Sequence, residues 1–388
     1  SWRKRQFAED GVRAFEQDLT WTRRHMPLTR AQSEQLPDLT GVRLAVSVHL
    51  DIKAIAAYEA LLQHGCQLFL TTCNPLTVRN NVVSYLVNKG ADAHVWHGMS
   101  AADQAEAMHR VIAWQPTHLC EMGADITAAL LEQRQSNPVK ASLEATGSGI
   151  SRINQLCAAG AALAYPIFNW DDLPIKEGLH NRYLVGLSTW HTFTERTHLS
   201  LHRKRVLVIG YGLVGQGVAD SARAYGGTVS IAERDPARLL EARYAGYEAG
   251  SLDELLPHAD VVVTATGVRH VLTTRHFSRL KDGCFLLNVG HVADEIEVDD
   301  FIPWQEVIPF VEEVTLNGRI IYLFAGGSMA NLVAGQGDTL NAFDLTLATM
   351  LAGLRYIFTP EAQNQPPKLY PLPRQVWEPV AAQAAQVS

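Results

Sequence analysis

The chain has 388 residues, of which 47% are apolar and 19% charged, and a formal net charge of -7 at pH 7. This length favours two domains over one large core, and the composition is that of an ordinary globular protein. The negative charge and the lack of a long Lys/Arg-rich run argue against nucleic acid or an anionic membrane as the main partner.

The spacing of the cysteines and histidines predicts no metal site. The five cysteines are scattered without CxxC spacing, and no pair of histidines has metal-ligand spacing. No signal peptide is recognisable, and no apolar run approaches the roughly 18 residues of a membrane-spanning helix. We therefore expect a cytoplasmic protein with free thiols.

The first half of the chain alternates between helical and strand patterns. An amphipathic helix is expected over residues 10–27. The predicted strands are 41–50, 66–74, 93–98 and 117–125, and the predicted helices are 52–65, 77–89 and 100–113. This alternation indicates a parallel sheet covered by helices on both faces. Ligands bind at the carboxyl ends of the strands in such sheets, so His49, Asn74 and Glu121 are expected to line a cleft.

A nucleotide-binding turn is predicted near the middle of the chain. An apolar strand ends in Gly210, and Gly212 and Gly215 complete a GxGxxG pattern at the start of a helix. These glycines permit a tight turn, approach of a pyrophosphate to the backbone and close helix packing. Glu233 closes the next strand, where a carboxylate would bind a ribose 2'-hydroxyl and disfavour a 2'-phosphate. NAD is therefore expected rather than NADP, although the neighbouring Arg234 could weaken that preference.

The remaining elements extend a second sheet. Residues 261–267 and 284–291 are predicted strands at regular spacing. Residues 318–335 predict a strand and a glycine-rich turn that carries Asn331. A helix over 340–356 could return to the first domain, and the last residues form a Pro-rich strap that ends in a weak helix.

The predicted fold class is α/β, with two domains that each contain a parallel sheet flanked by helices. The expected substrate-binding domain comprises residues 1–185 and a returning helix at about 340–358. Residues 186–339 are expected to form a Rossmann NAD-binding domain, and residues 359–388 a C-terminal strap. Because the chain crosses twice between the domains, a hinge that closes a cleft and excludes water is expected.

Several motifs together resemble those of the S-adenosylhomocysteine hydrolase family. In the second half they are VIGYGLVGQGVA, ERDPARLLEARYAGYE, ATGVRHVL, KDGCFLLNVGHVADEI and GGSMANL. In the first half they are RRHMPL, VHLDIKA, TTCNPL, CEMGAD, EATGSG and FNWDDLPIKEGLHN. The NVGH and GGSMANL matches are specific, because generic NAD dehydrogenases do not carry them in this order. The resemblance covers nearly the whole chain.

The resemblance implies an enzyme that keeps NAD as a resident catalyst. In this family a nucleoside 3'-hydroxyl is oxidised transiently, which acidifies the C4' hydrogen and allows the C5' substituent to leave. By resemblance, Lys176 helps to remove the hydroxyl proton, and Asn181 lies beside the nicotinamide and the sugar. His49 and His291 are implied to transfer protons at the reacting carbons. His180 stands where the family has an acid and is counted with this catalytic set.

The resemblance also implies contacts to the cofactor and the substrate. The implied cofactor contacts are Thr146, Ser148, Asn181, Gly210, Gly212, Leu213, Val214, Gly215, Glu233, Arg234, Thr266, Gly267, Asn288, Val289, Gly290, His291 and Asn331. The implied substrate contacts are Asp51, Lys53, Asn74, Met122, Ala145, Thr146 and Asp338. The expected partner is a small-molecule nucleoside, and a homo-oligomer (dimer or tetramer) without nucleic acid or membrane is expected.

Several positions depart from the family pattern, mainly around the substrate. Met122 and Ala145 stand where the family has acids, Lys53 where an acid faces adenine, and Asp338 where a histidine stands. The family's Lys-and-Tyr tail, which reaches a neighbour's NAD, has no counterpart. Because the redox set is retained, an altered substrate is favoured over a decayed enzyme. Lys53 and Asp338 could reverse the pattern of hydrogen-bond donors and acceptors offered to the base.

The sequence leaves other functions open. The ordinary activity would be hydrolysis of S-adenosylhomocysteine, and the alternatives are a nucleoside 5'-dehydratase or lyase that stops at elimination, a plain NAD-dependent dehydrogenase, and a catalytically silent NAD-binding regulatory paralogue. At the level of residues, Lys176 could be a solvated lysine in a turn. His49 could be a core histidine paired with Asp51, and His180 could be an exposed loop histidine.

Overall fold

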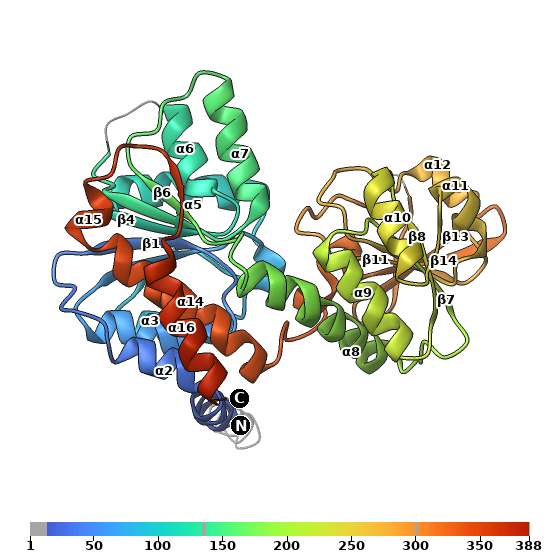
Figure 1. Ribbon diagram of the computed structural model, residues 1–388, viewed down its shortest axis with the longest axis horizontal. Coiled ribbons are helices and arrows are strands. Elements are labelled where there is room, and N and C mark those ends of the chain that lie inside the picture. Colours follow the sequence, from blue (N-terminus) through green and yellow to red (C-terminus); the bar gives the residue numbers. More distant parts are fainter. Residues whose placement is uncertain (1–13, 134–136, 299–301, 388) are drawn as a thin grey trace, which may run out of the picture. The chain divides into compact units, whose positions relative to one another are not determined.

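The computed structural model describes residues 14–133, 137–298 and 302–387. The chain divides into two compact units, each built around its own sheet (Figure 1). Unit 1 comprises Ser1–Lys176 and Leu340–Ser388, and unit 2 comprises Glu177–Thr339. The predicted α/β class, with two largely parallel sheets flanked by helices, is confirmed.

Unit 1 contains a seven-stranded parallel sheet. Its strands are β1 (Arg43–Ser47), β2 (Gln67–Thr71), β3 (Asp92–Ala93), β4 (His118–Glu121), β5 (Ala141–Glu144), β6 (Ile167–Asn169) and β15 (Leu369–Pro371). They pair in the order β15-β6-β5-β4-β1-β2-β3.

Helices cover both faces of this sheet. They are α2 (Pro27–Ser33), α3 (Ala54–Gln63), α4 (Asn80–Asn88), α5 (Ala101–Trp114), α6 (Asp125–Gln133), α7 (Gly147–Ala158), α14 (Leu340–Ile357), α15 (Pro360–Gln363) and α16 (Arg374–Val387), with a 3₁₀ turn η1 (Pro75–Thr77). In Figure 1, α2, α3, α14 and α16 lie on one side of the sheet, and α5, α6 and α7 on the other.

The topology of unit 1 identifies the edge of the sheet at which a ligand is expected. Leu44, Ala45 and Val46 of β1 are fully buried, as expected for a strand with helices on both faces. From β1 the chain winds through β2 and β3 towards one end of the sheet, and from β4 it winds through β5 and β6 towards the other. Ligands bind outside the carboxyl ends of the strands at such a switch point, here between β1 and β4.

Unit 2 contains an eight-stranded mixed sheet. Its strands are β7 (Arg205–Ile209), β8 (Thr228–Ala232), β9 (Glu248–Gly250), β10 (Val261–Thr264), β11 (Cys284–Asn288), β12 (Gln305–Ile308), β13 (Val311–Leu316) and β14 (Arg319–Phe324). Six of them are parallel, in the order β14-β11-β10-β7-β8-β9, and β12 and β13 extend β14 in antiparallel pairing. The switch point of this sheet lies between β7 and β10.

The helices of unit 2 follow the strands in alternation. They are α8 (Val185–Thr197), α9 (Leu213–Ala224), α10 (Pro236–Tyr244), α11 (Leu252–Leu255), α12 (Thr274–Phe277) and α13 (Ala330–Val333), with 3₁₀ turns η3 (Leu256–His258) and η4 (Ala325–Gly327). Within the described ranges, no helix combines the length and the apolar character needed to cross a membrane.

Two of the sequence-based element predictions need correction. The strand predicted at 93–98 is wrong beyond Ala93, where β3 ends. The backbone N–H of His97 donates to the side chain of Asn80, at 2.8 Å from Oδ1, instead of to a neighbouring strand. The helix predicted at 10–27 is helical at 14–24, after which α2 begins separately at Pro27; residues 10–13 lie outside the described ranges.

Several elements are not predicted by the sequence patterns, among them the following. Strand β15, within the expected strap, pairs in parallel with β6. The antiparallel strands β12 and β13 also escape prediction. The stretch Lys176–Leu184, whose polar residues suggest a turn, is a π-helical segment.

Candidate active site

His49 lies two residues beyond the end of β1, and its ring is held by two neighbours. Thr77 Oγ1 lies 2.8 Å from His49 Nδ1 and itself donates to the backbone carbonyl of Asn74 at 2.7 Å. A threonine hydroxyl has one proton, so His49 Nδ1 is the donor to Thr77, and the lone pair of the neutral ring is on Nε2. Cys73 Sγ lies 3.6 Å from His49 Nδ1. These contacts orient a base at the carboxyl edge of unit 1.

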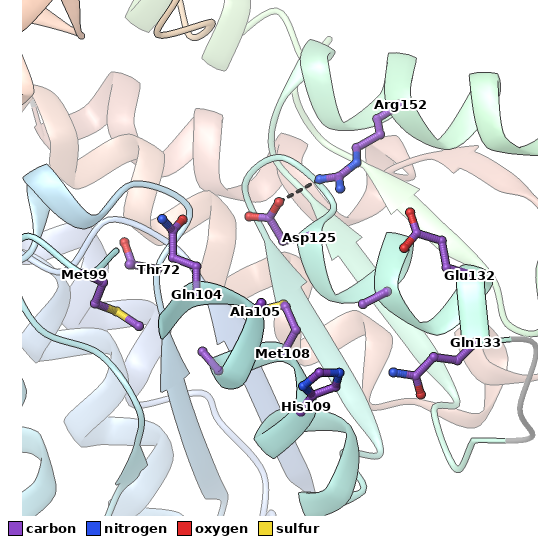
Figure 2. Close-up of a pocket in the computed structure, with 12 residues that line it drawn as sticks. Thr72, Met99, Gln104, Ala105, Met108, His109, Asp125, Glu132, Gln133 and Arg152 are labelled. Carbon is purple, nitrogen blue, oxygen red and sulfur yellow. Dashed lines mark hydrogen bonds and ion pairs between the residues drawn. The ribbon is translucent and has the colours of Figure 1, made fainter. Parts of the chain in front are cut away.

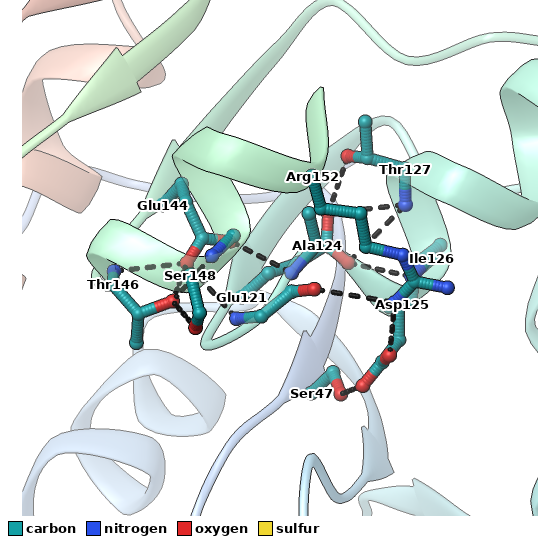
Figure 3. A network of polar contacts seen from close by, with 12 residues as sticks. Ser47, Glu121, Ala124, Asp125, Ile126, Thr127, Glu144, Thr146, Ser148 and Arg152 are labelled. Carbon is teal, nitrogen blue, oxygen red and sulfur yellow. Dashed lines mark hydrogen bonds and ion pairs between the residues drawn. The ribbon is translucent and has the colours of Figure 1, made fainter. Parts of the chain in front are cut away.

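Glu144, the last residue of β5, organises the loops that follow β4 and β5 (Figure 3). Its carboxylate accepts the backbone N–H groups of Gly123 and Ala124 at 2.9 and 3.0 Å, and that of Thr146 at 2.9 Å. Thr146 in turn caps α7, because its hydroxyl oxygen accepts the N–H of Gly149 at 3.0 Å. The position of Thr146 is therefore set by Glu144.

Glu121, the last residue of β4, has the same role at the start of α6. It accepts the backbone N–H groups of Ile126 and Thr127, at 2.6 and 3.2 Å, and the Thr127 hydroxyl. Both carboxyl groups are buried, and Glu121 pairs with Glu144 across the sheet. Burial raises the pKa of Glu121 to about 7. Burial, together with the negative charge of Glu121, raises the pKa of Glu144 to about 8.

These two carboxyl groups predict that stability falls as the pH rises. Their folded-state pKa values lie above the unfolded value of 4.5, so the folded protein binds the protons more tightly. The resulting stability is complete below about pH 4.5 and is lost as the pH rises through 7 and 8. The pKa of buried His118 is lowered to about 4. His118 is therefore neutral in both the folded and the unfolded protein above about pH 7, and it does not contribute to the fall in stability there. Thermal unfolding should show a midpoint several degrees lower at about pH 9 than at about pH 6.5.

A pair of variants identifies the groups responsible for this slope. Glu144→Gln should flatten the dependence of the midpoint on pH, because the amide does not titrate. The matched change Glu106→Gln, at an exposed residue of α5, should leave the slope as it is. A slope that is equal in all three proteins would contradict the assignment.

Lys176 is held by two oxygen atoms of unit 1. Its Nζ donates to the backbone carbonyl of Ala145 at 2.9 Å and forms an ion pair with Asp171. Both side chains of the ion pair are 13% exposed, so the alternative of a solvated lysine is wrong. Asp171 was not selected from the sequence, although it stands five residues before the lysine. At position 180, where the family pattern has an acid, this chain has His180. The acid that contacts Lys176 here is Asp171 instead.

Lys53 and Asp51 form a second buried ion pair near the end of β1. Lys53 Nζ lies 2.7 Å from Asp51 Oδ2, and the Lys53 side chain is only 4% exposed. The backbone N–H of Lys53 also donates to Asp51 Oδ1 at 2.9 Å. The ammonium group lies 5.5 Å from the centre of the Phe343 ring on α14. The partner of Asp51 is thus Lys53, whereas His49 binds Thr77.

The other predicted positions of unit 1 lie on the same loops. Met122 donates its backbone N–H to Ser47 at 2.9 Å, so the β4 loop is tied to the end of β1. Ser148 Oγ donates to Thr146 Oγ1 at 3.2 Å. Asn74 Oδ1 accepts the N–H of Leu76 at 3.0 Å. The structure therefore gathers the predicted residues of unit 1 at the carboxyl ends of β1, β2, β4 and β5.

A cavity of about 420 Å³ opens beside this edge (Figure 2). Its lining comes from the end of β2 and from α5, α6 and α7, with Thr72, Gln104, Asp125 and Arg152 among its polar side chains. Arg152 Nη1 lies 2.7 Å from Asp125 Oδ1. Thr72 directly precedes Cys73, so the cavity adjoins the site of His49. The sequence patterns do not point to this cavity.

In unit 2 the glycine turn has the close packing that its pattern predicts. Gly210 has a φ of +96°, which favours glycine. A Cβ atom on Gly215 would overlap the carbonyl oxygen of Gly210, so α9 lies directly against the turn. Gly212 precedes the first residues of α9, Leu213 and Val214, and no described side chain caps this helix. An uncapped helix N-terminus behind a tight turn suits a pyrophosphate.

Glu233 follows β8 and fixes the first residues of the turn. Its carboxylate accepts the backbone N–H of Tyr211 at 2.7 Å and those of Arg234 and Asp235 at 2.7 and 2.9 Å. The carboxylate therefore lies beside the glycine turn, where a ribose 2'-hydroxyl would bind.

Glu295 closes the loop after β10, a role that the sequence patterns do not reveal. Its carboxylate accepts the backbone N–H groups of Thr266 and Gly267 at 2.9 and 2.7 Å. Asn288, at the end of β11, accepts the N–H of Gly290 at 2.8 Å. These contacts fix the loops that carry Thr266, Gly267, Val289 and Gly290, with half-buried His291 next in the chain.

His180 belongs to a buried polar network in unit 2. Its Nε2 lies 2.6 Å from Asp338 Oδ2, and the histidine side chain is 13% exposed. Ser188 Oγ lies 3.0 Å from Asp338 Oδ1 and accepts a hydrogen bond from Asn331 Nδ2 at 3.1 Å. The alternative of an exposed loop histidine is therefore wrong. Two positions that depart from the family pattern, 180 and 338, contact each other.

The residues predicted to be catalytic divide between the two units. Lys176 and His49 belong to unit 1, and Asn181, His180 and His291 to unit 2. Among the described residues, no group of three or more His, Cys, Asp or Glu side chains is arranged to hold a metal ion.

Two family models match the chain. One, described as S-adenosyl-L-homocysteine hydrolase, matches residues 16–158. The other, described as S-adenosyl-L-homocysteine hydrolase, NAD binding domain, matches residues 181–337.

Individual relatives match over most of their length. An adenosylhomocysteinase of Thermococcus kodakarensis is 32% identical over 376 residues, which is 94% of this chain and 89% of the relative. An S-inosyl-L-homocysteine hydrolase of Methanococcus maripaludis is 30% identical over 87% of this chain and 84% of the relative. Another of that name, from Methanopyrus kandleri, is 29% identical over 94% of this chain and 88% of the relative.

Proposed function

The chain belongs to the S-adenosyl-L-homocysteine hydrolase family, and from this premise we propose that it acts at C3', C4' and C5' of a nucleoside. It is an NAD-dependent enzyme of the hydrolase class. The proposed reaction removes or exchanges the C5' substituent after the C4' hydrogen has been made acidic. The observation that carries the proposal is the pair of Lys176 and Asp171, held beside Ala145 where the loops of unit 1 meet.

Each catalytic residue has a proposed proton-transfer role. Lys176 passes one proton of its ammonium group to Asp171, and the amine that results receives the proton of the ribose 3'-hydroxyl. His49 removes the proton from C4', since its Nδ1 is bound to Thr77 and its basic lone pair is on Nε2. His291 is proposed to act at the C5' side.

The glycine turn of unit 2 fits NAD. Gly210, Gly212 and Gly215 leave the backbone open at the N-terminus of α9, and Glu233 lies beside the turn to bind the ribose hydroxyls. Bound NAD would supply reversible oxidation of the sugar hydroxyl. We propose that Thr266, whose loop is fixed by Glu295, is also in the cofactor shell.

The altered residues favour a substrate other than S-adenosylhomocysteine. Met122 and Ala145 leave two family acid positions without carboxylates, and Lys53 puts a buried cation where an acid would face adenine. A site built on hydrogen bonds rejects ligands that leave its buried groups unpaired. Relatives of similar identity are named for both adenosyl and inosyl substrates, so similarity alone favours neither base. A lyase that stops at elimination is the second candidate, favoured by the same missing acids.

A panel of nucleosides in deuterated water tests this proposal. The true substrate should take up deuterium at C4', because that step needs only the oxidised sugar and a nearby base. Homocysteine release from S-adenosylhomocysteine should be far slower than the ~10 s⁻¹ typical of enzymes. Release of homocysteine near that rate would contradict an altered substrate and would favour ordinary hydrolysis of S-adenosylhomocysteine.

Absorbance of the reduced nicotinamide separates the rival functions. A resident cofactor gives turnover without net NADH, whereas a plain dehydrogenase accumulates NADH. A silent paralogue gives neither NADH nor deuterium uptake with any nucleoside, and that result would contradict the proposal.

A further inference from the structure

We propose that Ser188 and Asp338 are positioning residues for the cofactor. They orient the side-chain amide of Asn331 so that its oxygen accepts a hydrogen bond from the carboxamide of the nicotinamide. The proposal rests on the proposed function in one respect, which is that the nicotinamide lies at the carboxyl edge of the unit 2 sheet. Asp338, which the resemblance implies to contact the substrate, acts on the cofactor instead.

Asn331 lies at the edge of the sheet where the nicotinamide is expected. It belongs to α13, which begins directly after Met329, and Met329 forms a parallel bridge with Asn288 at the end of β11. The loop after β11 carries Gly290 and His291, so Asn331 shares this edge with two other predicted cofactor contacts. The Asn331 side chain is nearly buried, because the residue is only 4% exposed.

Two acceptors determine where the Ser188 hydroxyl donates. Ser188 Oγ lies 3.0 Å from Asp338 Oδ1 and 3.1 Å from the backbone carbonyl oxygen of Val185. A carboxylate oxygen and a carbonyl oxygen only accept hydrogen bonds, so the single proton of the hydroxyl goes to one of these two. The carboxylate is the stronger acceptor because it is charged. Towards Asn331, the Ser188 oxygen can therefore act only as an acceptor.

The Ser188 oxygen in turn orients the amide of Asn331. Asn331 Nδ2 donates to Ser188 Oγ at 3.1 Å. The opposite orientation would bring two oxygen atoms together with no proton between them. Asn331 Oδ1 therefore faces away from Ser188, and among the described residues it accepts no hydrogen bond. A nearly buried amide whose oxygen lacks a donor indicates a ligand with an N–H group, which the carboxamide of nicotinamide supplies.

The segment that carries Asp338 is fixed in place. The backbone N–H of Gly337 donates to the backbone oxygen of Asn331 at 2.9 Å, and a Cβ atom on Gly335 would overlap Thr192 Oγ1 of α8. The other carboxylate oxygen of Asp338 lies 2.6 Å from His180 Nε2, and it is the acceptor there. Because both oxygens of this carboxylate accept, the order of donors from Asn331 through Ser188 is set by Asp338.

Competition between NAD and two analogues for the full-length protein, freed of NAD, tests this assignment. 3-Acetylpyridine adenine dinucleotide keeps the carbonyl oxygen of the nicotinamide but has a methyl group in place of the amine. Thionicotinamide adenine dinucleotide keeps the amine and has sulfur in place of the oxygen. The bound amounts are measured by mass spectrometry after denaturation. NAD and the thio analogue should each be preferred over the acetyl analogue by about tenfold, the scale of one buried hydrogen bond.

Substitutions at the two positioning residues should reduce this preference. In Ser188→Ala the amide of Asn331 can turn either way, so the preference should fall to within about twofold. In Asp338→Asn the new amide can itself donate to Ser188 Oγ, so the preference should fall by at least about threefold. Thr189→Ala is the matched control. Thr189 is the next residue of α8, and its buried hydroxyl donates to the same Val185 carbonyl at 2.8 Å, so its loss should leave the preference unchanged.

The ratio of bound cofactors separates orientation of the amide from general stability, because a less stable protein binds all the cofactors less without changing their ratio. Equal binding of NAD and the acetyl analogue by the unaltered protein would overturn the assignment. An unchanged preference in Asp338→Asn would also overturn it, even if Ser188→Ala does not fold. The expected preference without C4' exchange on any nucleoside would support the assignment and contradict the proposed function. Exchange without the preference would overturn the assignment alone.

Discussion

Replacement of Lys176 by alanine is expected to lower C4' exchange and turnover by roughly 10²-fold or more, the usual scale for a lost acid–base group. The Lys176 amino group is held by Ala145 and Asp171 at the meeting point of the unit 1 loops, and alanine leaves no amine there to receive the hydroxyl proton. NAD content should be unchanged, because the glycine turn and Glu233 belong to unit 2. Deuterium uptake at C4', measured by mass spectrometry, gives the rate, and release of NAD on denaturation gives the cofactor content.

Three further variants sharpen this test. Asp171→Asn retains the shape of the side chain but removes its charge, so it should shift the pH dependence of the rate as well as its size. His180→Ala should lower the rate less than Lys176→Ala. His180 is paired with Asp338, so we expect it to hold its loop in place and not to transfer a proton to or from the substrate. Lys368→Ala, at an exposed lysine of unit 1, should leave the rate unchanged. Equal, negligible effects of the changes at 176 and 180 would remove the lysine from the mechanism.

Substitutions in the glycine turn should separate the folding of unit 2 from its binding of NAD. In Gly215→Ala the new methyl group would overlap the Gly210 carbonyl, so α9 must move away from the turn. Overpacking of this kind costs at least about 1–3 kcal/mol. We expect both a lower thermal midpoint and NAD content below about a tenth of the unaltered protein. In Gly212→Ala the nearest atom, Arg238 Nη1, would be 3.6 Å away, so the fold should persist.

Gly212→Ala should therefore lower the NAD content without lowering the thermal midpoint. Its methyl group would occupy the space at the N-terminus of α9 where a pyrophosphate approaches the backbone. Thermal unfolding and NAD content, measured on the same samples, distinguish the two variants. Gly178→Ala is the matched control, because a Cβ atom there meets no atom within 4 Å. Full NAD content in Gly215→Ala would contradict the proposed position of the cofactor.

Local patterns in the sequence determined much of the fold. Runs of buried β-branched and aliphatic residues identified β1, β2, β7, β10 and β11, because a strand with helices on both faces is apolar throughout. The glycine turn was likewise predicted, since its residues lie within six positions of one another. The strand predicted at 93–98 was not correct, because pairing at a sheet edge depends on contacts such as His97 with Asn80.

The sequence by itself thus determined the α/β class, the glycine turn with Glu233, and the candidate acid–base residues. Only the tertiary structure decided which groups these residues contact. Ser188 meets Asp338 across 150 positions of the chain, and Lys176 meets Ala145 across 31. The cavity beside His49 is likewise assembled from the end of β2 and from the separate helices α5, α6 and α7. Contacts of this kind depend on the order of the strands in a sheet, and no local pattern of residues determines that order.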